Sequence, residues 1–60
     1  MIYVKVASNN VVVDVAKNAT DGYVEVNKSW PFDIFNAHGD YCYKYVDGQI
    51  VQRTNNEING

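Results

Sequence analysis

The chain has 60 residues, of which 47% are hydrophobic and 20% charged, with one cysteine and a formal net charge of −2. This length supports one domain with a small core, and a single cysteine excludes an intrachain disulfide. The five basic residues are dispersed and form no patch that could neutralise phosphates, so we expect no nucleic-acid partner. Because neither a disulfide nor a metal cluster reinforces so small a core, we expect self-association or a protein partner.

The first part of the chain predicts three strands. Residues 2–7 and 11–16 alternate in side-chain character with a period of two, and the turn-forming residues 8–10 separate them, which indicates an antiparallel hairpin. A third strand, residues 23–26, follows the turn signal Asp21-Gly22, and the three strands together predict a meander. On the first strand, one face is expected to carry Ile2, Val4 and Val6. On the second, one face would carry Val11, Val13 and Val15, and the other Val12, Asp14 and Ala16. On the third, Val24 and Val26 would face inward.

Residues 28–40 interrupt the alternation. Ser29 can cap a helix, Pro31 suits its first turn, and Gly39 suits its end. We therefore expect one or two helical turns, or an irregular loop, laid over the open face of the sheet. Trp30 and Phe35 would supply much of the buried area of this segment, about 150–250 Å² each.

Two alternating runs, residues 41–46 and 49–53, flank Asp47-Gly48, which predicts a two-residue type I′ hairpin. The predicted fold class is therefore mainly β: a small antiparallel sheet, made of a meander plus this C-terminal hairpin, with one short helix or loop over a face. Residues 1–53 would form a single β domain. Residues 54–60 form a polar tail whose Thr54 and Glu57 have the spacing of a capping box, so we expect disorder or one frayed helical turn.

The candidate catalytic residues do not predict an enzyme. A nucleophilic Cys42 would need His38 within hydrogen-bond reach and an orienting group, whereas burial among tyrosines would make the thiol inert. One Cys and one His are too few for a zinc site. Asp33 and Asp40 flank His38 and could form a cation site with it, but turn and cap roles account for both carboxylates. We expect no cofactor, no metal and no small-molecule substrate.

The tyrosines are the most informative surface candidates. Tyr41, Tyr43 and Tyr45 alternate and would lie on one strand face. Either this face is the core, covered by the aromatic residues of segment 28–40, or it is open and forms an interface, where Tyr and Trp are enriched. The candidate interface comprises Tyr3, Tyr23, Trp30, Phe35, Tyr41, Tyr43 and Tyr45.

The string YKYVDGQIVQRT, residues 43–54, resembles short proteins and terminal segments of tailed bacteriophages and prophages that are encoded near tail-fibre or baseplate genes. The strand at residues 24–26 and the aromatic segment 30–35 are similar to the layout of those proteins. Such proteins often continue into a Glu-rich helix, which this sequence nearly lacks after Ile58. The resemblance implies an accessory, tail- or fibre-associated role without enzymatic activity, and it supplies no site residues.

The sequence thus predicts a non-enzymatic structural or binding module that acts by oligomer formation or by docking to a larger protein. The alternative is a small regulatory protein that binds and inhibits a host enzyme, since the acidic balance suits a basic partner site. The start of the chain lacks the features of a signal peptide, and no apolar run approaches the length of a membrane span. We therefore expect the protein in the cytoplasm of a bacterial host or on a virion, with no membrane partner.

Overall fold

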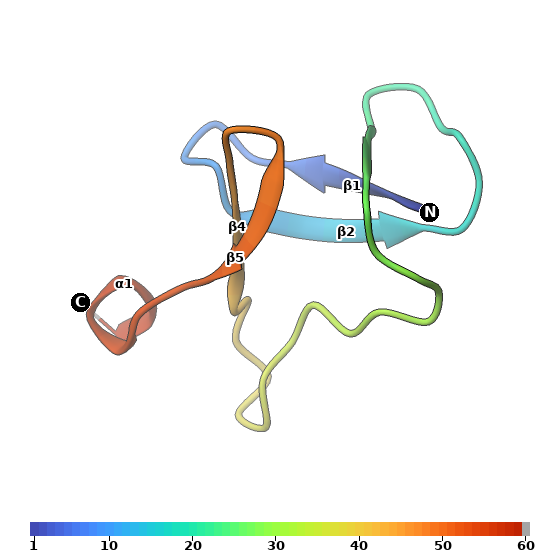
Figure 1. Cartoon of the computed structure of the whole chain (residues 1–60). Coiled ribbons are helices and arrows are strands. Elements are labelled where there is room, and N and C mark those ends of the chain that lie inside the picture. Colours follow the sequence, from blue (N-terminus) through green and yellow to red (C-terminus); the bar gives the residue numbers. More distant parts are fainter. Residues whose placement is uncertain (60) are drawn as a thin grey trace.

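Residues 1–59 are described by a computed structural model of the chain, and in this range five strands and one short helix form (Figure 1). The elements are β1 (Ile2–Val6), β2 (Val12–Ala16), β3 (Val24–Val26), β4 (Tyr43–Val46), β5 (Gln49–Gln52) and α1 (Asn55–Asn59). All strand pairs are antiparallel, which confirms the predicted fold class. No helix within residues 1–59 is both long and apolar enough to cross a bilayer.

The strands form two small sheets, and the first is not a meander. Its order is β2-β1-β3, so β3 returns to pair with β1, which becomes the central strand. The connection over residues 17–23 is longer than the two to five residues, roughly, of a hairpin loop, and it carries the chain past β2 to the far edge of β1. The second sheet is the hairpin β4-β5.

The predicted hairpin turn at Asp47-Gly48 is present. The φ angles of Asp47 and Gly48 are +51° and +82°, and both residues of a type I′ turn require positive φ. Tyr45 faces Ile50 and Val46 faces Gln49 across the ladder. The local signal therefore sets the register of β4 and β5.

A β-bulge in β2 decides which of its valines enters the core. Lys5 faces Asp14 but Val6 faces Val12, so Val13 is the extra residue on β2. An extra residue reverses the alternation of side chains beyond it. Val12 is consequently fully buried, whereas Val13 is only half-buried, and the expected pairing of Val13 with Val15 on one face is not observed.

The core draws on both sheets and on the segment between them. Its buried members are Ile2, Val4, Val11, Val12, Val26, Ile34 and Ile50. Val24, which was expected to face inward, is 38% exposed. Beside β2 the two sheets are joined by a bridge between Val11 and Lys44 and by the Tyr45 N–H, which donates to the Asn10 carbonyl at 2.8 Å.

The segment from 27 to 42 forms the irregular loop of the two expected alternatives, and it contains no helix (Figure 1). The Asp33 carboxylate accepts the Phe35 N–H at 3.0 Å, and the Asn36 side-chain oxygen accepts the N–H groups of His38 and Asp40 at 2.8 and 3.0 Å. Such local side-chain bonds compete with helix formation. Of the two expected alternatives the helix that would begin at Ser29 and Pro31 does not form, and the Trp30-Pro31 peptide is cis.

The polar tail forms one helical turn, α1, opened by the expected capping box; Gly60 lies outside the described residues. The Thr54 hydroxyl accepts the Glu57 N–H at 3.2 Å, and the Glu57 carboxylate accepts the Thr54 N–H at 3.0 Å. Lys44 of β4 donates to the same carboxylate at 2.8 Å. Arg53 donates to the Tyr41 carbonyl at 2.8 Å and to the Glu57 carbonyl. These contacts attach α1 to the hairpin.

Replacing Lys44 is expected to change the titration of Glu57. Hydrogen bonds from the Lys44 ammonium, and then from the Thr54 N–H, lower the pKa of Glu57 from 4.5 to about 2. Because the folded pKa is lowered, the contact stabilises the attached tail above pH 4.5 and is lost as the pH falls toward 2. The Glu57 carboxyl carbon shift, followed by NMR, should titrate with a midpoint near 2 in the wild type.

In Lys44→Gln the midpoint of Glu57 should rise, because the first of these hydrogen-bond donors loses its charge. Lys17→Gln, which changes the net charge equally at an exposed site, should leave it in place. An unchanged midpoint in Lys44→Gln would mean that the ion pair does not hold α1 against β4.

Candidate protein-binding surface

Two of the predicted interface residues lie on the outer face of the three-stranded sheet. Tyr3 sits between buried Ile2 and Val4 on β1, so its side chain points away from the core. Its hydroxyl donates to Glu25 at 3.1 Å, and the hydroxyl of Tyr23 donates to Asp14.

The hydrogen bonds to these carboxylates shift the pKa values of both tyrosines and of Asp14. The bond to Glu25 raises the pKa of Tyr3, and the bond to Asp14 raises the pKa of Tyr23. In turn the Tyr23 hydroxyl, followed by the Val15 N–H, lowers the pKa of Asp14. Both phenols are thus satisfied by this sheet's own carboxylates, and they are separate from the tyrosines of β4.

Tyr43 and Tyr45 of β4 are half-buried and pack against the core. The rings of Tyr43 and Phe32 lie 4.9 Å apart with an angle of 51° between their planes, a tilted aromatic contact. Phe32, from the irregular segment, therefore takes the covering role that was expected of Trp30 and Phe35. These two tyrosines contribute to the core through much of their surface.

The remaining three residues of the predicted interface are exposed. Phe35 and Tyr41 are 45% and 38% exposed, and their rings stack with centroids 5.0 Å apart and planes at 29°. An isolated bridge between the two residues holds the pair in place at the base of the 36–40 turn. Trp30 lies earlier in the same segment and is 46% exposed. The structure therefore divides the seven residues of the candidate interface into three separate groups.

The candidate residues for a nucleophilic or cation site do not come together in the structure. Cys42 is half-buried, and its thiol donates to the Ile34 carbonyl at 3.5 Å. His38 is exposed in a turn, where Asn36 accepts its N–H, and Asp33 accepts the N–H of Phe35. Within residues 1–59, no three or more His, Cys, Asp or Glu side chains are grouped to hold a metal ion.

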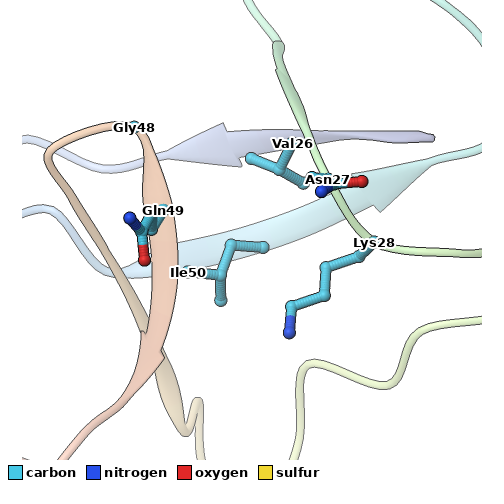
Figure 2. Close-up of a pocket in the computed structure, with 6 residues that line it drawn as sticks. All are labelled: Val26, Asn27, Lys28, Gly48, Gln49 and Ile50. Atoms are coloured by element: carbon cyan, nitrogen blue, oxygen red, sulfur yellow. The ribbon is translucent and has the colours of Figure 1, made fainter.

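A cleft between β3 and β5 was not predicted from the sequence. It has a volume of about 260 Å³ and is lined by Val26, Asn27, Lys28, Gly48, Gln49 and Ile50 (Figure 2). It forms because the end of β3 and the start of β5 face one another, and strands so far apart in sequence give no local signal of their proximity. A second hollow of about 460 Å³ lies between the 36–40 turn and α1.

Comparisons of the chain with protein-family models, with curated proteins and with solved structures found no match.

Proposed function

We propose that this protein is a non-enzymatic structural or binding module that acts through protein–protein contacts, and that its first partner is a second copy of itself. The proposal assigns it an accessory role in a phage or prophage tail. That role is supported by the resemblance of residues 43–54, which form the hairpin β4-β5 and the start of the tail.

The observation that carries the proposal is the exposed, stacked pair Phe35–Tyr41. Stacking against one another restricts both rings, so less side-chain entropy is lost on binding than for two separate exposed rings. Rigid, partly exposed aromatic rings are the residues that most often dominate protein interfaces. A chain of this size also buries only about 60% of the surface it exposes when unfolded, so association adds burial that the monomer lacks.

Light scattering after size-exclusion chromatography should show an oligomer at high micromolar concentration, and Phe35→Ala should shift the protein toward the monomer. Val46→Ala is the matched control, since Val46 is also apolar and 42% exposed but lies at the β4-β5 turn. We expect that control to self-associate like the wild type.

The fluorescence of Trp30 provides a second measurement of self-association, because Trp30 is the chain's one tryptophan and is 46% exposed. A wild-type protein that stays monomeric at every concentration would contradict self-association. Loss of the oligomer in both variants would show that general hydrophobicity, and not the Phe35–Tyr41 pair, drives it.

A further inference from the structure

The cleft between β3 and β5 is bounded by two strand edges that have no strand partner among residues 1–59. β3 pairs with β1 alone, and β5 pairs with β4 alone. The cleft is lined by the end of β3 with the two residues that follow it and by Gly48, Gln49 and Ile50 at the start of β5. Figure 2 shows these two segments on opposite sides of the opening. The sheet edges thus face each other across a gap.

The hairpin register indicates which backbone groups of β5 point into this gap. In a two-residue hairpin the pair beside the turn, here Val46 and Gln49, exchanges hydrogen bonds, and the next pair, Tyr45 and Ile50, does not. The Tyr45 N–H accordingly points outward and donates to Asn10. By the same alternation the N–H and carbonyl groups of Ile50 point away from β4, on the free edge of β5.

The side chains around the gap combine an apolar floor with one cation. Val26 and Ile50 are 3% and 9% exposed and form the floor. The Lys28 side chain extends from beyond β3 toward Ile50 (Figure 2). The ion pair formed within residues 1–59 is Lys44–Glu57, so Lys28 has no carboxylate partner there.

We infer that this cleft receives an extended peptide segment that carries a carboxylate, which adds as a strand to the free edge of β5 while its acidic side chain meets Lys28. Strand addition to an exposed edge is a common form of peptide recognition, in which backbone bonds give affinity and side-chain contacts give specificity. Because Lys28 has no carboxylate partner within residues 1–59, its ammonium group favours a segment with an acidic side chain over a neutral or basic one.

The inference rests on the proposed function in that it assumes a protein-binding module, but it concerns a different surface from the Phe35–Tyr41 pair.

The test is an NMR titration of the ¹⁵N-labelled chain with a short capped peptide of alternating valine and threonine with a central aspartate. The amide signals of Lys28, Gln49 and Ile50 should shift, and the Ile50 amide should gain protection from exchange with solvent.

Lys28→Glu should weaken peptide binding by about fivefold, the scale of an exposed ion pair. Lys17→Glu is the matched control, because it changes the net charge equally at an exposed site outside the cleft, and it should bind like the wild type. A peptide with lysine in place of aspartate should bind less tightly. A peptide with alternate N-methylated amides should not bind, since it cannot pair with the edge.

Equal binding of the aspartate and lysine peptides would overturn the charge selection, and equal binding of the N-methylated peptide would overturn the strand addition. If the cleft amides shift with protein concentration and not with peptide, a second copy occupies the cleft and the inference fails. These outcomes are separate from the proposed function, which is tested by Phe35→Ala in the absence of peptide. Peptide binding by a strictly monomeric chain would support the cleft and contradict self-association.

Discussion

Ile34→Ala is expected to destabilise the protein by about 3 kcal/mol, whereas Phe35→Ala should leave its stability nearly unchanged. The two residues are neighbours, but Ile34 is 5% exposed and packs in the core, while Phe35 is 45% exposed. Ile34 is the residue by which the irregular segment packs into the core, and its carbonyl also accepts the Cys42 N–H at 3.1 Å. Its loss would therefore leave a cavity between that segment and the sheets.

Urea unfolding followed by far-ultraviolet circular dichroism measures both variants. A domain of this size commonly has only about 3–5 kcal/mol of stability, so Ile34→Ala should be partly unfolded without denaturant. If the larger, exposed Phe35 proved the more costly of the two, the placement of the segment on the core would be incorrect. In that case loss of association in Phe35→Ala would also reflect loss of folding.

Val12→Ala is expected to cost about 2 kcal/mol, and Val13→Ala less than about 1 kcal/mol. The two substitutions remove the same atoms from adjacent positions of β2, so their difference measures the effect of the bulge. Val12 is fully buried because Val13 is the extra residue opposite β1. Without the bulge, β2 would alternate regularly and the larger cost could fall on Val13.

Equilibrium unfolding of the two variants under the same conditions provides the comparison. Val51→Ala serves as a baseline for an exposed strand valine, since Val51 on β5 is 36% exposed. A larger loss for Val13→Ala than for Val12→Ala would contradict the register of β1 and β2.

The fold class could be predicted because its signals are local. Alternating side chains specify strands, and Asp47-Gly48 specifies both the turn and the register of the last two strands. The capping box of α1 was readable for the same reason.

The pairing of β3 with β1 could not be predicted, because it depends on which partner buries Val26 best and no nearby residue encodes that choice. The bulge at Val13 is also set by the tertiary packing, since the sequence of β2 alternates equally well without it. The sequence left a helix and an irregular loop open after Ser29, and the loop forms, with Asp33 and Asn36 accepting N–H groups of nearby backbone in place of helical bonds.

Which of the candidate residues are exposed could be predicted only in part. Aromatic content led to the interface hypothesis, but a strand pattern cannot tell which tyrosines a distant loop will cover. Phe32, which was not among the candidates, packs on Tyr43, while Phe35 stacks outside on Tyr41. The hydroxyl groups of Tyr3 and Tyr23 donate to carboxylates on the outer face of the three-stranded sheet, so these two tyrosines lie apart from those of β4.

The central place of β1 has a consequence for how the protein forms during synthesis. β1 is synthesised before the four other described strands, yet one of its two neighbours is β3, and the core closes only when Ile50 arrives on β5. Contacts that span most of a chain form more slowly than those of a local hairpin. One edge of β1 therefore stays unpaired until β3 has emerged, and its core face stays uncovered until β5 has emerged. Until β3 arrives, that edge is open to pairing with other nascent chains.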